Sequence, residues 1–293
     1  MGFRTVIIKS RSKLEFRLNS LVVRGDQEQK VFIDEINTLI VQSTAVSLTA
    51  ALLNELTRRN IKVIFCDEKC NPTAELIPHC GAHNTAKRYR EQFEWGRDIK
   101  AKVWREIIKK KILEQAALLY EKGFYLQSEM LIEYADEVQE NDRTNREGHA
   151  AKVYFNCLLG SDCSRQSGGF RNACLNYGYA ILLSTFNREI AASGRLTQIG
   201  IWHENEFNPF NLACDLMEPF RVAVDRLAFS LEENDKDFKK KMANVLNLNT
   251  LIAGKNTTLE LAARQYMNSV FHAIEQRDVS LIVFPEKITQ DEL

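Results

Sequence analysis

Two carboxylates three residues apart, Asp215 and Glu218, stand in the otherwise mostly apolar stretch NPFNLACDLMEPFR. Residues at this spacing lie on one face of a helix, so both acids can point at the same spot. A buried carboxylate needs a cation or a metal as a partner, and a solvated helix face is the alternative interpretation. For the metal site, we expect both acids to face a cleft and at least one of their pKa values to be raised by repulsion and burial.

Two further polar residues stand in segments that suit a metal site built between helices. His203 lies in GIWHENEFNPF, twelve residues before Asp215, and a neutral imidazole binds divalent metals or transfers protons. Glu204 and Glu206 are close to it, so the local sequence does not single out one ligand. Glu147 precedes a strongly helical run in NREGHAAKVYF, where a lone acid usually interacts only with the helix dipole.

The charges of the chain are unevenly distributed although the formal net charge is zero. Residues 87–111 carry ten Lys or Arg against four acids, whereas residues 129–147 carry seven acids against two Arg. A basic face attracts phosphate, so residues 87–111 predict a DNA-binding surface. For any single residue, a solvated helix face is the alternative. The candidates are Arg88, Arg90, Arg97, Lys100, Arg105 and Lys109.

The hydrophobic patterns that must position these residues predict an α+β fold. Short segments rich in Val, Ile, Thr and Phe predict strands through the first eighty residues, with a helix at 46–60. From about residue 88 the pattern is helical almost to the end, and the final FPEKITQDEL is predicted to be irregular. We therefore expect a mainly β domain at residues 1–80, a linker at 81–87 and a larger, all-helical domain at 88–293.

The composition also bears on the compartment. The N-terminal MGFRTVIIKS lacks a long apolar run, and no window reaches the roughly 20 apolar residues of a membrane span. Seven cysteines at irregular spacing favour reduced thiols, so we expect a cytoplasmic protein with no membrane partner. A rival zinc site, with irregular spacing, could use Cys66, Cys70, His79, Cys80 and His83.

Four motifs in a fixed order resemble the CRISPR-associated integrase family, the catalytic subunit that inserts new spacers into CRISPR arrays in antiviral defence. The motifs are E-G-x-x-A from Glu147, GGFRNACLNYGYAILL at 168–183, G-I-W-H-E around His203, and F-N-L-A-x-D-L-M-E-P-F-R ending at Arg221. The resemblance runs over nearly the whole chain. The form DLMEPFR and the length of 293 residues look most like type II systems.

The resemblance assigns roles to individual residues. It implies that Glu147, His203 and Glu218 are catalytic and together bind Mg²⁺ or Mn²⁺. Many relatives in other subtypes carry Asp at the position of Glu218, and the longer side chain preserves oxygen ligation. Asp215 receives a supporting role, and so does Tyr177, in packing around the site near DNA.

The activity that the resemblance implies is that of a metal-dependent DNA endonuclease and integrase. The 3′-OH ends of short foreign DNA fragments would attack repeat phosphodiesters by transesterification. The implied partners are double-stranded DNA, a second copy joined through the β domain, a small ferredoxin-like adaptation subunit that completes a heterohexamer, and further type II adaptation proteins. Two alternatives stay open: a general metal-dependent nuclease of branched or single-stranded DNA, and a catalytically inactive DNA-binding scaffold.

Overall fold

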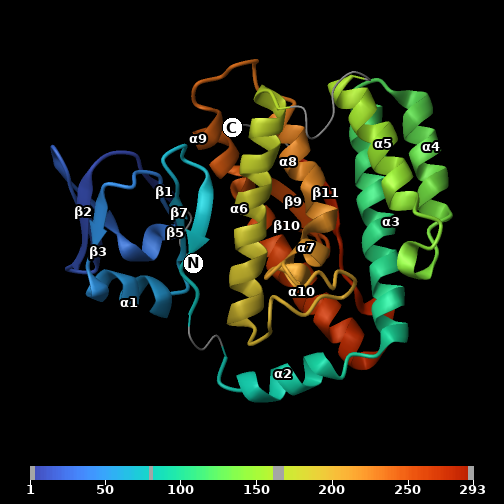
Figure 1. Ribbon diagram of the computed structural model, residues 1–293, viewed down its shortest axis with the longest axis horizontal. Helices are drawn as coiled ribbons and strands as arrows, with labels where there is room; N and C mark the ends of the chain where they lie inside the picture. The colour runs from blue at the N-terminus through green and yellow to red at the C-terminus, as the bar shows by residue number, and fades with distance from the viewer. Residues whose placement is uncertain (1–3, 79–81, 161–167, 290–293) are drawn as a thin grey trace. The chain divides into compact units, whose positions relative to one another are not determined.

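The computed structural model describes residues 4–78, 82–160 and 168–289, and the chain divides into two compact units (Figure 1). The first comprises Met1–Thr85 with Ala191–Gly194, and the second comprises Ala86–Ile190 with Arg195–Leu293. A strand-rich first unit and a helical second unit confirm the predicted α+β class. Among the described residues, no helix combines the length and the apolar composition that crossing a bilayer requires.

The first unit is built of strands, as its Val- and Ile-rich segments predict. They are β1 (Arg4–Ile8), β2 (Ser12–Arg17), β3 (Ser20–Arg24), β4 (Glu28–Phe32), β5 (Ile36–Val41), β6 (Val46–Leu48), β7 (Lys62–Cys66) and β8 (Pro72–Glu75). One sheet has the order β1-β5-β7-β8 and the other has the order β4-β3-β2-β6. Parallel pairing joins β1, β5 and β7, whereas β2, β3 and β4 pair antiparallel through tight connections.

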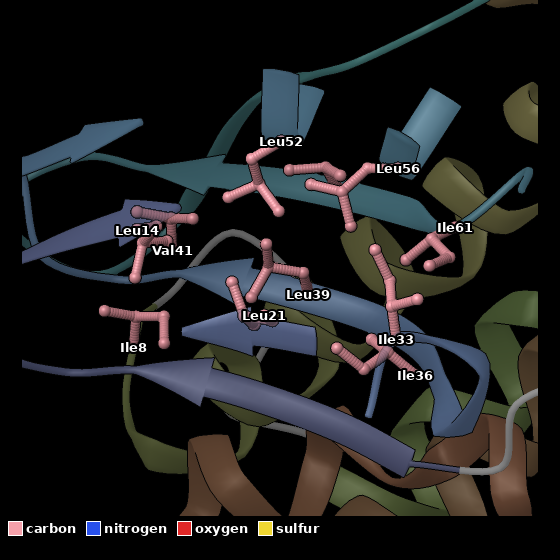
Figure 2. Packing of buried hydrophobic residues seen from close by; sticks show 11 residues of the cluster. Ile8, Leu14, Leu21, Ile33, Ile36, Leu39, Val41, Leu52, Leu56 and Ile61 are labelled. Atoms are coloured by element: carbon pink, nitrogen blue, oxygen red, sulfur yellow. The ribbon is translucent and has the colours of Figure 1, made fainter. Parts of the chain in front are cut away.

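Helix α1 (Ala50–Arg58) supplies one side of the core of this unit. It begins later than the predicted residue 46, because residues 46–48 form strand β6 beside β2 and Thr49 caps the helix, accepting a hydrogen bond from the Leu52 backbone at 3.3 Å. Leu52 and Leu56 point from α1 toward the strands (Figure 2). Leu52 and Leu56 belong to the same cluster of apolar side chains as Leu39 of β5, and all three are fully buried, so hydrophobic burial fixes α1 on the strands.

The second unit is mainly helical. Its helices are α2 (Thr85–Phe93), α3 (Arg97–Glu121), α4 (Tyr125–Asp136), α5 (Arg146–Leu159), α6 (Phe170–Ala192), α7 (Asn211–Met217), α8 (Arg221–Ala228), α9 (Phe238–Ala243) and α10 (Leu259–Gln276). Short 3₁₀ turns in the chain are η1 (Ile33–Glu35), η2 (Glu140–Asp142), η3 (Glu218–Phe220), η4 (Val245–Asn247) and η5 (Val279–Leu281). The 25-residue α3 packs against α4, α5, α8, α10 and η3, and therefore forms the centre of this unit (Figure 1).

A glycine in α6 permits close helix packing. A Cβ added at Gly178 would lie 2.5 Å from Val224 Cγ1 of α8, which is closer than side chains can approach. The glycine of the segment NYGY is therefore required by the contact between α6 and α8.

The second unit also contains a three-stranded sheet that the sequence analysis did not predict. Strands β9 (Asn249–Ile252) and β10 (Lys255–Thr258) form a hairpin, and its turn residues Ala253 and Gly254 have positive φ angles of 50° and 70°. Strand β11 (Pro285–Thr289) pairs with β9. The prediction of an irregular tail was wrong for β11, because its hydrogen-bond partner lies far away in the sequence.

Candidate active site

Asp215 of α7 anchors the segment that carries His203. The fully buried carboxylate accepts backbone N–H bonds from Ile201 at 2.6 Å, from Trp202 at 2.8 Å and from His203 at 3.2 Å. Its Oδ1 also contacts His203 Nδ1. Because Nδ1 faces the carboxylate, Nε2 is the ring nitrogen left to bind a metal or to move a proton.

The chain can wrap this closely around Asp215 because residue 200 is glycine. A Cβ at Gly200 would lie 2.7 Å from Asp215 Oδ2 and still closer to the His203 carbonyl oxygen. Any side chain there would push the backbone donors away from the carboxylate. The motif G-I-W-H-E therefore depends on its glycine as well as on its histidine.

The surroundings of His203 fix its ring and leave open space beside it. Trp104 of α3 meets the imidazole edge-on, with ring centroids 5.6 Å apart, and stacks on Trp202. A cavity of about 620 Å³ is lined by His203, Lys100, residues 198–200, residues 204–209 and Asn211. A substrate could therefore approach the imidazole from this cavity.

The protonation of His203 reflects the acids around it. The hydrogen bond with Asp215 raises the pKa of His203 above its ordinary value, and burial opposes this shift. The charges of Glu218 and Glu147 raise it further. The imidazole thus lies within the electrostatic field of both predicted metal-binding acids.

Glu147 and Glu218 converge on one ammonium group, that of Lys111 in α3. Lys111 Nζ lies 2.6 Å from Glu147 Oε1 and 2.5 Å from Glu218 Oε2. Burial alone would lower the pKa of Lys111, but the attraction of Glu218 and Glu147 outweighs burial and raises it. Acids from the start of α5 and from η3 are thus brought together on one face of α3.

Arg221 holds the second oxygen of Glu218. Its Nε donates to Oε1 at 2.8 Å, and its guanidinium lies over the Tyr179 ring, 4.8 Å from the centroid. Burial would raise the pKa of Glu218, but the charges of Arg221 and Lys111 lower it to about 2. The expectation of a raised pKa is therefore wrong for Glu218, because this acid faces two cations.

Asp215 and Glu218 also do not share one helix face as predicted. Helix α7 ends at Met217, and Glu218 begins the 3₁₀ turn η3 next to Pro219. Asp215 faces the backbone of residues 201–203, whereas Glu218 faces Lys111. The change of helix type thus separates Asp215, which positions His203, from Glu218, which could bind a metal.

Three residues at this site were not singled out from the sequence: Lys111, Arg221 and Tyr179. Lys111 could have been found, because it lies on the helical stripe of Ile107, Ile108 and Ile112, where an unpaired charge is costly. The predicted Tyr177 is buried instead against α9, with Lys239 Nζ 5.5 Å from its ring centroid. The nearby Tyr179 is the tyrosine that contacts Arg221.

The six predicted DNA-binding residues differ in their surroundings. Arg88 pairs with Glu275 at 2.8 Å, Lys109 with Asp136 at 2.8 Å and Arg105 with its neighbour Glu106 at 2.7 Å. Lys100 lies 3.7 Å from the exposed Glu204 and lines the cavity beside His203. Arg90 and Arg97 are exposed and make no ion pair with any described residue.

The rival zinc cluster is only partly visible. Cys66 is buried on β7, and Cys70 follows in a turn with a positive φ of 58°. His79 and Cys80 lie outside the described residues, so the zinc hypothesis stays a prediction.

Glu147, Glu218 and His203 are ligand types that suit a divalent cation. Two carboxylates and an imidazole with an oriented Nε2 form a donor set that Mg²⁺ and Mn²⁺ accept. The buried Oε2 of Glu218 accepts no hydrogen bond of normal geometry, although it contacts the Lys111 ammonium. As the side chains stand, no three His, Cys, Asp or Glu among the described residues are grouped closely enough to chelate an ion. Ligation by Glu147, His203 and Glu218 would therefore need these side chains to move closer together.

The chain matches the model of one protein family. The family described as "CRISPR associated protein Cas1" matches residues 5–251. The chain belongs to the Cas1 family. The predicted resemblance to the CRISPR-associated integrase is confirmed by this match.

Individual Cas1 relatives and solved structures agree with this assignment. The CRISPR-associated endonuclease Cas1 of Neisseria meningitidis is 32% identical over 237 residues, which cover 80% of this chain and 78% of that protein. A casposase bound to its integration product has the same fold, with a TM-score of 0.77, 18% identity, and coverage of 98% and 92%. A Cas6-RT-Cas1–Cas2 complex matches all of this chain and 36% of its own, with a TM-score of 0.73 and 16% identity.

Proposed function

We propose that this protein is a metal-dependent DNA integrase that joins the 3′-OH ends of short DNA fragments to phosphodiesters of a CRISPR repeat. Membership of the Cas1 family and the endonuclease name of its relative support this activity. The likeness to a casposase bound to an integration product supports joining in addition to cutting. The observation that carries the proposal is that Glu147 and Glu218 meet on one ammonium group, while Asp215 orients His203, whose pKa both of their charges raise.

The side chains divide the work between ligation and positioning. Glu147, Glu218 and His203 Nε2 would hold Mg²⁺ or Mn²⁺, which when bound polarises a phosphate and favours ionisation of the attacking hydroxyl. Asp215 fixes the tautomer and orientation of His203. Lys100, at the cavity beside His203, is placed to attract a DNA phosphate.

The reaction balances without a covalent protein intermediate. The 3′ oxygen of the fragment forms a bond to a phosphorus of the repeat, and the bond from that phosphorus to the repeat's own 3′ oxygen breaks. The attacking hydroxyl loses its proton, and the departing oxygen takes up one proton. With water in place of the 3′-OH, the same groups would hydrolyse the strand, which makes the protein an endonuclease.

We propose the partners and domain roles as follows. Residues 1–80 contribute the homodimer contact, residues 81–87 link the domains, and residues 88–293 bind double-stranded DNA and carry the catalytic residues. The likeness to a Cas1–Cas2 assembly supports a small ferredoxin-like partner that bridges two dimers into a heterohexamer. The protein would act on DNA in the cytoplasm.

A strand-transfer assay tests the activity. A labelled fragment with 3′-OH or 3′-dideoxy ends is incubated with repeat DNA and the protein, in Mn²⁺ or in EDTA. We expect joined products only with 3′-OH ends and Mn²⁺, and we expect Glu218→Gln to abolish them. Gln suits the test better than Ala, because Ala would leave Lys111 and Arg221 around an empty space. Glu129→Gln, at an exposed acid of α4 that does not line the cavity beside His203, is the matched control and should join normally.

The alternatives predict different products. A general nuclease would cut branched or single-stranded DNA without joining, whatever the chemistry of the 3′ ends. An inactive scaffold would bind the DNA but neither cut nor join it in Mn²⁺. Joining by Glu218→Gln at the parental rate would remove this residue from the reaction.

A further inference from the structure

We propose that Lys111 is a built-in competitor for the divalent metal, an internal cation that must leave the acid pair before the ion can bind. The inference rests on the proposed function, because it takes Glu147 and Glu218 as ligands. It adds that metal loading is coupled to the movement of one ammonium group.

The first ground is the occupation of Glu218. Both of its oxygens contact a cation: Oε1 accepts from Arg221 Nε at 2.8 Å, and Oε2 lies 2.5 Å from Lys111 Nζ. The carboxylate is almost completely buried, with 4% of its residue surface exposed. A metal ion that coordinates Glu218 must therefore approach an oxygen that already contacts a positive charge, and the two cations repel.

The second ground is that Lys111 bridges the same two acids that the metal requires. Its Nζ also lies 2.6 Å from Glu147 Oε1. Metal–oxygen bonds are about 2.0–2.1 Å long for Mg²⁺, so an ion bound to these two oxygens would overlap the ammonium.

The third ground is that Lys111 is the cation free to move. The Arg221 guanidinium is also held by the Tyr179 ring, 4.8 Å away. Lys111 carries its charge on a flexible four-carbon stem with rotatable donors. Displacement of Lys111 thus exchanges one cation for another on the acid pair, without rearrangement of the helices.

Binding of Mn²⁺ to the full-length protein, measured by calorimetry, tests the competition. Lys111→Met should bind Mn²⁺ about tenfold more tightly than the parent, which corresponds to about 1.4 kcal/mol. Lys111→Arg, which keeps the charge, should stay within about twofold of the parent. Lys110→Met is the matched control. It removes an equal charge from the same helix, where Lys110 pairs with Glu114 at 2.7 Å.

A second readout follows from the loss of the internal cation. In EDTA, Lys111→Met should unfold at a lower temperature than the parent, since two acids lose their shared partner. Mn²⁺ should then raise the unfolding temperature of Lys111→Met more than that of the parent. Equal Mn²⁺ affinity in parent and Lys111→Met, or equal tightening in Lys110→Met, would overturn the proposal.

Labelling of the parent protein keeps the proposal testable if Lys111→Met does not fold. Acetic anhydride modifies exposed amines, and mass spectrometry reports each lysine. Mn²⁺ should increase the labelling of Lys111 severalfold and leave that of Lys110 unchanged, and unchanged labelling of Lys111 would contradict displacement. The proposed metal site fails separately if Glu218→Gln binds Mn²⁺ as tightly as the parent.

Discussion

At the residue scale, Asp215 has the most direct control over the site, although it is not itself placed to bind the metal. We expect Asp215→Asn to lower the free energy of unfolding by about 2–3 kcal/mol, because an amide cannot accept all the charged hydrogen bonds of the carboxylate. Affinity for Mn²⁺ should fall by about 10–100-fold, as for other residues that orient metal-binding histidines. Urea unfolding in EDTA and calorimetric titration with Mn²⁺ measure the two effects.

The matched control for Asp215 is Glu206→Gln, at an exposed acid of the same segment. It should change neither the unfolding free energy nor the affinity for Mn²⁺. If folded Asp215→Asn binds Mn²⁺ as tightly as the parent, Asp215 does not orient a ligand.

His203 determines the expected pH dependence. Its pKa is raised above 6.5, and metal can bind only the neutral ring, so affinity for Mn²⁺ should increase as the pH rises through that pKa and then level off. Glu218, with a pKa of about 2, stays ionised over this range and adds no proton competition. Calorimetry at about pH 6, 7 and 8 measures the rise, which His203→Gln should remove.

The contribution of His203 to folding stability decreases as the pH rises, whereas its contribution to Mn²⁺ affinity increases. Without metal, its raised pKa stabilises the folded protein fully below about pH 6.5, and this stabilisation is lost as the pH rises through the folded pKa. Urea unfolding in EDTA at the same pH values should show this loss in the parent and not in His203→Gln. A parental stability that increases over this range would contradict the assignment.

At the element scale, helices α2 and α3 carry the predicted DNA-binding residues. Those without an ion pair to any described residue are the ones we expect to contribute most to DNA binding. Arg90 and Arg97 are exposed and unpaired among the described residues. If both contact phosphates, the double variant Arg90→Ala/Arg97→Ala should flatten the dependence of log affinity on log salt by about two units. Fluorescence anisotropy with a DNA duplex over a series of salt concentrations measures this slope.

The control for the basic helices is Arg88→Ala/Lys109→Ala. Both residues already pair with acids, Glu275 and Asp136, so their removal should change the slope less. An equal change in the two double variants would mean that the ion pairs do not decide which residues contact DNA.

At the scale of the whole molecule, we expect the proposed homodimer to form through exposed apolar residues of the first unit. Leu18 is 88% exposed and Phe32 47% exposed. They lie close together, because Phe32 of β4 pairs with Ser20, two residues after Leu18. Leu18 also has a positive φ of 46°, so an apolar side chain is held at a turn where polar residues are usual.

We expect the full chain to form a dimer with twice its mass of 33.7 kDa in light scattering. The double variant Leu18→Asp/Phe32→Asp should shift it to the monomer, since the dimer would bury four unpaired charges, two from each copy. Phe207→Asp, at an 85% exposed residue of the second unit, should remain dimeric. A stable dimer of the double variant would place the contact elsewhere.

The sequence by itself determined the fold class, the Cas1 relationship and the types of residues at the site. Periodic hydrophobic patterns are local, so they were sufficient for the body of α1 and for most strands of the first unit, but not for β6, which lies in the segment predicted to be helical. The four motifs identified Glu147, His203 and Glu218, because the order of short motifs can be recognised in the sequence without knowledge of contacts.

Only the tertiary structure decided the pairing of charges and the last sheet. Strand β11 takes its hydrogen bonds from β9, and Lys111 takes its partners from α5 and η3. Neither partner is close in the sequence, and local periodicity carries no information about them. The pKa of Glu218 is lowered, whereas the sequence predicted a raised one, for the same reason. The sign of the shift depends on which charges the packed helices bring within contact distance.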